Sequence, residues 1–118
     1  KDCKSNAYSF GRSGDASGIF INCSDIDLDA ARSFGQLGIA SGTFTNCVGG
    51  VQSFGAFGQC SGVFVNCTGG ILAFGGNTGT LTGKLYYCRL TSGTFKTVSG
   101  VGITRYCIDG NNATNNQG

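Results

Sequence analysis

The 118-residue chain contains no His, Trp, Met, Pro or Glu. Without His, and without any C-x-x-C pair, the usual zinc-ligand spacings are missing. No apolar run approaches the about 18 residues needed to cross a membrane. The net charge of +2 is spread along the chain rather than clustered into the basic patch typical of nucleic-acid binding. We therefore expect no metal, no cofactor, no nucleic-acid partner and no membrane insertion.

Strong helix formers are also scarce, whereas Gly, Thr, Ser, Asn, Val and Phe dominate. Each Gly costs about 1 kcal/mol in a helix relative to Ala. Thr, Val and Phe favour strands. Proline removes a backbone donor, so its absence is typical of strands with neighbours on both sides. The composition predicts an all-β protein.

A repeat of about twenty residues runs through the chain. Its unit reads S-F-G-x-x-G-x-[AC]-S-G-x-F-x-N-C-x-G-G-x-x. Six of the seven cysteines mark it, with gaps of 20, 24, 20, 21 and 19 residues. A Phe follows each of the first five by seven residues, except Phe34, which follows Cys23 by eleven. This exception predicts a four-residue insertion within residues 24–32. A Gly five residues before the cysteines keeps the same phase.

One such unit is too short to bury its own apolar face, so it must stack on its neighbours. The period excludes propeller blades and paired-helix repeats, and the L-x-x-L-x-L signature of leucine-rich repeats is absent. The repeat therefore predicts a parallel β-solenoid of about 20 residues per coil, with about five coils stacked about 4.8 Å apart and a C-terminal cap. We expect regular coils over 1–75, irregular or capping coils over 76–110, and a polar tail over 111–118 that is disordered or leads to another domain.

Within a coil, strand alternation turns Phe44 inward and Thr43 and Thr45 outward. Asn46 falls at a corner, because Asn tolerates the left-handed conformation, and stacked Asn side chains can form an amide ladder. Gly-Gly predicts a second corner and Phe-Gly a third. The expected structural ladder comprises Phe10, Phe20, Asn22, Cys23, Phe34, Phe44, Asn46, Cys47, Phe54, Phe64, Asn66, Cys67, Phe74, Cys88, Phe95 and Cys107.

The column of cysteines suggests buried free thiols rather than disulfides. Neighbouring coils lie about 4.8 Å apart, whereas bridged Cβ atoms lie about 3.8 Å apart. Cys60 stands where other coils have Ala16 and Ala40. The alternative is an occasional bridge between adjacent coils.

Two departures from the repeat are candidate sites. The first comprises Asp25, Asp27 and Asp29, which alternate and would share one face of a strand. They suggest a Ca²⁺ site, a carboxylate cluster for sugar cleavage, or a solvated loop. The second is the stretch after Gly75, which combines basic and Tyr residues. It suggests a simple cap, or a tip that touches a ligand such as a glycan; its candidate contacts are Tyr86, Arg89, Arg105 and Tyr106.

The outward positions beside the inward Phe are unusually apolar, as at Ile19, Ile21, Val63 and Val65. They suggest an oligomer interface, such as three rods side by side, or simple strand propensity. A flat Thr array for ice is a weaker alternative, because only one coil has Thr at both positions.

The stretches "ASGTFTNCVGG…SFG" and "CRLTSGTF…VSGVG…CIDGN" resemble β-helical repeats, and the module that follows them, in tail-fibre and tailspike-like proteins of bacteriophages. The resemblance covers about Cys3 to Asn112. It implies a right-handed parallel β-helix within a homotrimer, located in the virion and mediating adsorption to a host-surface glycan. No catalytic motif can be carried across; the matching residues are the Phe, Asn, Gly and Cys of each coil.

The resulting hypothesis is a structural, receptor-binding segment of a phage tail fibre that is not an enzyme. One alternative is a tailspike-type polysaccharide-degrading segment, with the three Asp residues as acids or bases. Another is an extracellular solenoid adhesin of a bacterial surface.

Overall fold

A computed structural model of the chain describes residues 1–5, 10–11, 13–25 and 33–118. Among these residues all regular secondary structure is β-strand, and no helix long and apolar enough to cross a membrane occurs. The strands are β1 (Lys4–Ser5), β2 (Ile19–Ile21), β3 (Ser24–Asp25), β4 (Ile39–Ala40), β5 (Thr43–Thr45), β6 (Gln59–Cys60), β7 (Val63–Val65), β8 (Thr68–Gly69), β9 (Thr80–Leu81), β10 (Lys84–Tyr86), β11 (Arg89–Leu90), β12 (Ile103–Ile108) and β13 (Thr114–Gln117).

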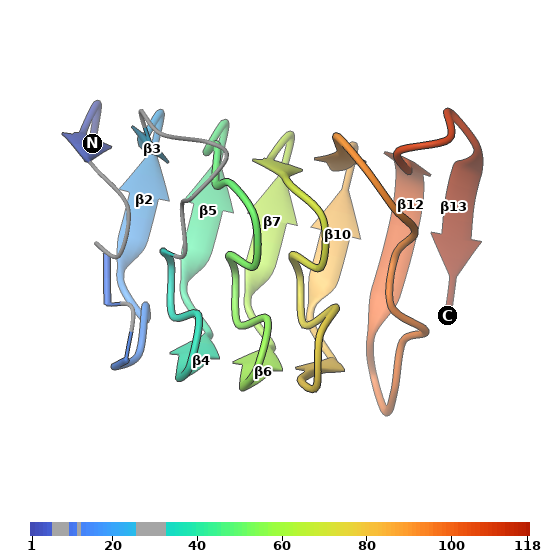
Figure 1. The fold of residues 1–118 in the computed structure, drawn as a ribbon, viewed down its shortest axis with the longest axis horizontal. Coiled ribbons are helices and arrows are strands. Elements are labelled where there is room, and N and C mark those ends of the chain that lie inside the picture. Colours follow the sequence, from blue (N-terminus) through green and yellow to red (C-terminus); the bar gives the residue numbers. More distant parts are fainter. Residues whose placement is uncertain (6–9, 12, 26–32) are drawn as a thin grey trace.

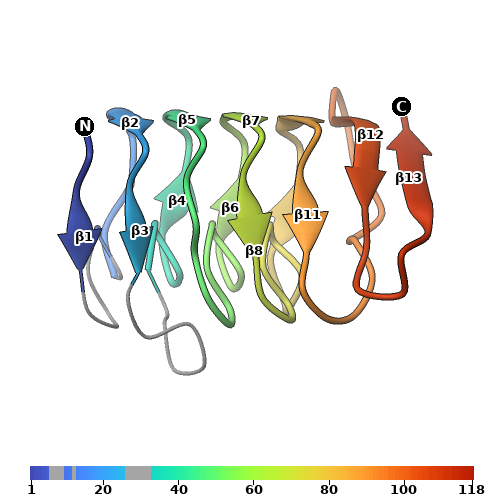
Figure 2. The same ribbon diagram turned by 90° about the horizontal axis from the view of Figure 1, so that it is seen from above.

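These strands wind into a right-handed parallel β-solenoid (Figure 1), as the repeat and the resemblance predicted. Its first face carries β2, β5, β7, β10 and the start of β12, in that order. The second face carries β1 and β3 at one end and β8, β11 and the end of β12 at the other (Figure 2). The third face carries β4, β6 and β9. Strands on one face thus come from successive coils.

The register of the first face places equivalent residues directly beside one another. Phe20 pairs with Phe44, Phe44 with Phe64, Phe64 with Leu85, and Leu85 with Thr104. The five strands of this face therefore define four complete turns of the solenoid. The molecule measures 31 Å along its longest axis, which runs along the stack of coils (Figure 1).

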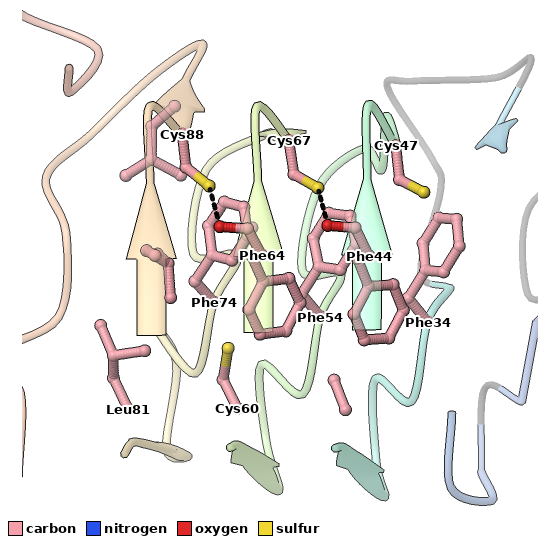
Figure 3. Packing of buried hydrophobic residues seen from close by; sticks show 14 of the residues in the cluster. Phe34, Phe44, Cys47, Phe54, Cys60, Phe64, Cys67, Phe74, Leu81 and Cys88 are labelled. Carbon is pink, nitrogen blue, oxygen red and sulfur yellow. Dashed lines mark hydrogen bonds between the residues drawn. The ribbon is translucent and has the colours of Figure 1, made fainter. Parts of the chain in front are cut away.

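Two columns of phenylalanine fill the interior (Figure 3). Within each column the rings are stacked 4.6–4.9 Å apart and nearly parallel, which is the spacing of successive coils. Between the columns the rings meet edge to face at 5.5–6.1 Å. Edge-to-face and offset-stacked contacts are the two favourable arrangements of aromatic rings. The inward assignment of both Phe columns is confirmed; Phe95 ends one of them with a tilted ring, 5.9 Å from Phe74.

All seven cysteines are free thiols, as expected; six are buried and Cys3 is exposed. In the column, the thiol of Cys67 donates to the carbonyl oxygen of Phe44 (3.3 Å), and that of Cys88 to the carbonyl oxygen of Phe64 (3.4 Å) (Figure 3). Cys47 and Cys107 donate in the same way to Phe20 and Leu85, so four cysteines of the column add weak hydrogen bonds between coils. Cys60 lies on the third face, and burial raises the pKa of its thiol.

The corners are made by residues with left-handed backbone. Asn22, Asn46 and Asn66 have φ of 53–55°, as predicted. At the Phe-Gly corner both residues are left-handed, as at Phe54 (φ 54°) and Gly55 (φ 70°).

The Gly-Gly pairs do not form the remaining corner, which was the expectation. The left-handed residues lie further along the chain, at Gln52 (φ 56°) and Leu72 (φ 61°). The glycines are needed for space instead: a Cβ on Gly49 would lie 2.7 Å from the Cβ of Ser53 and 2.8 Å from the ring of Phe54.

The polar tail forms a strand, which neither of the alternatives from the sequence foresaw. β13 pairs antiparallel with β12 and covers its outer edge (Figure 1). The guanidinium of Arg105 fastens it by donating to the carbonyl oxygens of Gln117 (2.6 Å) and Gly118 (2.7 Å). A solenoid must cover its terminal edge or leave backbone groups open to pairing with other chains, and β13 does so here.

A tyrosine corner beside exposed cations

One corner of the solenoid changes character along its length. It lies at the residue before each cysteine of the column, after the strand of the first face. From the N-terminal end, the residues at this corner are Asp2, Asn22, Asn46, Asn66, Tyr87 and Tyr106, and all have positive φ. The side-chain amides of the three asparagines form a continuous ladder. Asn66 donates to Asn46 (2.8 Å), Asn46 to Asn22 (3.2 Å), and Asn22 to the carboxylate of Asp2 (2.9 Å).

In the last two coils the ladder gives way to two stacked tyrosines. The rings of Tyr87 and Tyr106 have centroids 5.2 Å apart and planes inclined by 13°. Their side chains are 60% and 63% exposed, so the pair projects from the corner into solvent. Both residues keep the left-handed backbone, with φ of 56° and 54°. This conformation costs a side chain other than Asn or Asp about 1–2 kcal/mol, so the backbone alone favours Asn here.

The coil that carries Tyr87 also carries two exposed cations. Arg89 lies two residues beyond Tyr87 on the second face, is exposed, and donates to the side chain of Asn112 (3.2 Å). Lys84 is exposed at the start of β10. No acidic residue occurs between Ser33 and Ile108. Asp109 is buried, and its carboxylate accepts hydrogen bonds from the backbone N–H groups of residues 111 and 113. The C-terminal part of the described solenoid therefore presents cations and no exposed carboxylate side chain.

The other residues predicted at this end have different surroundings. Tyr86 is half-buried on the outside of the first face, and the register pairs it with Arg105. The guanidinium of Arg105 is engaged by the carbonyl oxygens of the last strand and by that of Thr104. Arg105 therefore holds the tail in place, while Tyr106 and Arg89 remain accessible.

Asp25, the one member of the predicted Asp cluster within the described residues, does not lie on the outer surface. Asp25 is buried, with 4% of its surface exposed, and its carboxylate accepts a hydrogen bond from the hydroxyl of Ser33 (2.9 Å). Asp27 and Asp29 lie outside the described residues, as does most of the predicted insertion. Within the described ranges, no group of three metal-ligating side chains and no pocket is found.

The outer surface of the first face has the apolar character that the sequence predicted. Ile19 is 74% exposed and Val63 is 36% exposed. Thr43 and Lys84 lie in the same row across the strands as Ile19 and Val63. A second row, two residues further along each strand, contains Ile21, Thr45 and Val65. The two rows make a flat, mostly β-branched surface along four coils.

The ligand contacts predicted from the sequence did not include Tyr87. Its signal was present in the repeat, because it stands immediately before Cys88, as Asn46 does before Cys47. Asn suits the left-handed backbone at this corner better than Tyr does, so the backbone conformation does not explain why Tyr stands there.

No protein-family model, no curated protein and no solved structure matches this chain.

Proposed function

We propose that this chain is a structural, receptor-binding module: a segment of a phage tail fibre that displays a binding surface for attachment to the host. The single observation that carries the proposal is the unbroken parallel stack of coils, which leaves one corner aromatic and exposed at its C-terminal end. Backbone hydrogen bonds join each coil to the next, and the aromatic columns fill the interior. Such a body is stiff, and a stiff scaffold loses little conformational entropy when it binds.

On this proposal the protein is part of the virion and forms a homotrimer through its first face. The support is the flat surface of Ile19, Ile21, Val63 and Val65, which resembles an interface more than a solvated sheet. Packing of three such faces around a common axis would bury these side chains and leave the tyrosine corner at the margin.

Sedimentation velocity tests the oligomer directly. We expect the full chain to sediment as a trimer, and Val63→Lys, at an exposed position of this face, to shift it toward monomer. Thr80→Lys, an exposed position on the third face, is the matched control and should remain trimeric. A wild-type chain that is monomeric at tens of micromolar would contradict the trimer.

Attachment is tested by adding the fluorescently labelled full chain to a panel of bacterial strains of different surface polysaccharide. Saturable adsorption to a subset, inhibited by the polysaccharide purified from that subset, is the expected result. Adsorption to no strain would contradict the receptor-binding role.

The same purified polysaccharide separates this proposal from the polysaccharide-degrading alternative. A reducing-end assay should show no release of oligosaccharide. Release that disappears in Asp27→Asn or Asp29→Asn would instead make the chain an enzyme.

A further inference from the structure

We infer that the tyrosine corner, formed by Tyr87, Tyr106 and Arg89, is a binding site for an anionic polysaccharide. This inference rests on the proposed function and names the ligand class and the residues that would carry attachment. It begins with the backbone. Three coils place Asn at this corner, where Asn suits the left-handed φ and extends the amide ladder. The last two coils place Tyr there, with the same φ and no place in that ladder.

Core packing does not account for the tyrosines either. A tyrosine that stabilises an interior is buried, whereas these two are 60% and 63% exposed. Their contact with each other recovers part of the backbone cost, because a stacked aromatic pair contributes about 0.5–1.5 kcal/mol. What the pair adds beyond folding is a rigid aromatic surface that carries two hydroxyl groups. Tyr is well suited to recognition, since it offers a large contact area and a hydrogen-bonding group with few rotatable bonds.

The geometry of the pair fits a linear chain of sugars. The two ring centroids are 5.2 Å apart because they belong to successive coils. This distance is close to the length of one hexose unit in an extended polysaccharide. A glycan that runs along the solenoid axis would therefore meet, with each successive sugar, the exposed edge and the phenol group of one stacked ring. The hydroxyls of such sugars can exchange hydrogen bonds with the two phenol groups, and their C–H groups can contact the exposed ring edges.

The charge of the surroundings selects an anionic glycan. Arg89 is exposed two residues beyond Tyr87. One nitrogen of its planar guanidinium donates to Asn112, and the remaining N–H groups can donate to a carboxylate or a sulfate. The charges also divide along the chain. Residues 1–75 contain four Lys and Arg against five Asp, whereas residues 76–118 contain four against the single Asp109, which is buried. An anionic ligand is thus attracted to the end that carries the tyrosines.

The decisive variants restore the residue that the other coils use. Tyr87→Asn, Tyr106→Asn and the double variant remove the aromatic surface while they extend the asparagine ladder. Their midpoint of urea unfolding should equal or exceed that of the wild type. Their affinity for oligogalacturonate, a linear glycan with a carboxylate on every sugar, should fall about tenfold or more in the double variant, as for truncation of a central aromatic contact.

A pair of charge variants tests the role of Arg89. Lys4 occupies the same row of the second face, which runs through Ser24, Val48 and Thr68 to Arg89. Arg89→Gln should weaken oligogalacturonate binding several-fold and reduce its dependence on salt. Lys4→Gln removes the same charge at the opposite end of the row and should change the affinity less than twofold.

Isothermal titration of the full chain and these variants, at low and high salt, decides the matter. Neutral oligogalactan should bind at least tenfold more weakly than oligogalacturonate. Titration with dextran sulfate will show whether sulfate can replace carboxylate at the same residues. The inference is overturned if oligogalacturonate does not bind, or if the double Tyr→Asn variant binds it like the wild type. It is equally overturned if neutral glycan binds as well as the anionic one, or if a single-stranded oligonucleotide of equal charge binds more tightly.

The outcome is separable from that of the proposed function. If the chain adsorbs to bacteria and the double Tyr→Asn variant adsorbs equally, this site is wrong and the attachment role stands. If the tyrosines bind oligogalacturonate and no strain is adsorbed, the site stands and the attachment role is wrong.

Discussion

At the residue scale, the asparagines before the cysteines do two things at once. Asn46 takes the left-handed φ of 53°, and its side chain donates to Asn22 and accepts from Asn66. Most other side chains would be strained in this backbone, whereas the short polar side chains of Asn and Asp tolerate it because they can hydrogen-bond locally. The corner and the ladder are therefore one feature, produced by one residue type repeated in phase.

Replacement of Asn46 tests this reasoning. Asn46→Ala should lower the free energy of unfolding by about 1–3 kcal/mol, because it combines backbone strain with the loss of two hydrogen bonds. Asn46→Gly removes the same hydrogen bonds without strain and should cost less. Urea denaturation of the three proteins makes the comparison. Equal losses for Ala and Gly would mean that the left-handed backbone is not a constraint at this position.

The phenylalanine columns should carry much of the stability. Phe44 is completely buried within one column, and its ring also contacts two rings of the other column edge to face. Phe44→Ala should therefore lower the free energy of unfolding by about 3–5 kcal/mol. Phe20 lies at the end of the same column and is only half-buried, so Phe20→Ala should lower the free energy of unfolding by less. Both losses can be measured by urea denaturation. A loss below about 1 kcal/mol for Phe44→Ala would contradict the packing described here.

The buried thiol of Cys60 should make stability depend on alkaline pH. Burial raises the pKa of Cys60 above that of an unfolded thiol, which is about 8.5. Its protonated form is therefore favoured by folding; this contribution is complete below the unfolded value and is lost as pH rises through the folded value. The free energy of unfolding should fall as pH rises above about 8.5. Cys60→Ala, which copies Ala40 in the neighbouring coil, should reduce that fall. If the wild type and Cys60→Ala show the same dependence of unfolding free energy on pH, the raised pKa of Cys60 does not cause the fall.

At the element scale, the C-terminal strand is the main addition that the structure makes to the sequence. The tail shows neither the apolar alternation of a strand nor the Gly and Phe phases of the repeat, so its pattern did not predict β13. The strand forms because β12 offers an open edge, and because Arg105 binds the last carbonyl groups. Long-range pairing of this kind is decided by the partner, and a pattern within the segment cannot reveal it.

Removal of residues 111–118 should expose the edge of β12. The truncated protein is expected to self-associate, because an uncovered edge strand pairs with other chains. Size-exclusion chromatography and thioflavin fluorescence would detect this. Arg105→Gln gives a milder form of the same test, with faster hydrogen exchange in β13 and little change in β7. A truncated protein that keeps the size distribution of the full chain would show that β13 is not a protective strand.

The corners show where prediction from the sequence succeeded and where it failed. Asn46 and the Phe-Gly corner were predicted because their residue types have a known backbone preference and recur at fixed spacing. The Gly-Gly pairs were misread because glycine serves both backbone freedom and close approach, and only coordinates separate the two. The burial of Asp25 was not predicted, because alternation places residues on a shared face only within one strand, and β3 ends at this residue. Tyr87 could have been found by reading the repeat as columns.

At the scale of the whole molecule, the solenoid is a linear stack in which each coil contacts only its neighbours. In such stacks, stability is close to a sum over coils and the interfaces between them. The chain therefore passes from one coil to the next at an equivalent position in every coil. This equivalence underlies the ladder, the aromatic columns and the rigid display that we propose.

Deletion of a single coil is the most direct test of this account. Removal of the twenty residues 46–65 joins Thr45 to Asn66, which both preserves the phase of every column and shortens the stack by one coil. The shortened protein should keep the far-ultraviolet circular dichroism of a β protein and a cooperative, though weaker, urea transition. Removal of only residues 46–55 shifts every later column by half a coil and should abolish the transition. If the twenty-residue deletion is unfolded, or the ten-residue deletion folds as well as it does, the chain is not wound once per repeat.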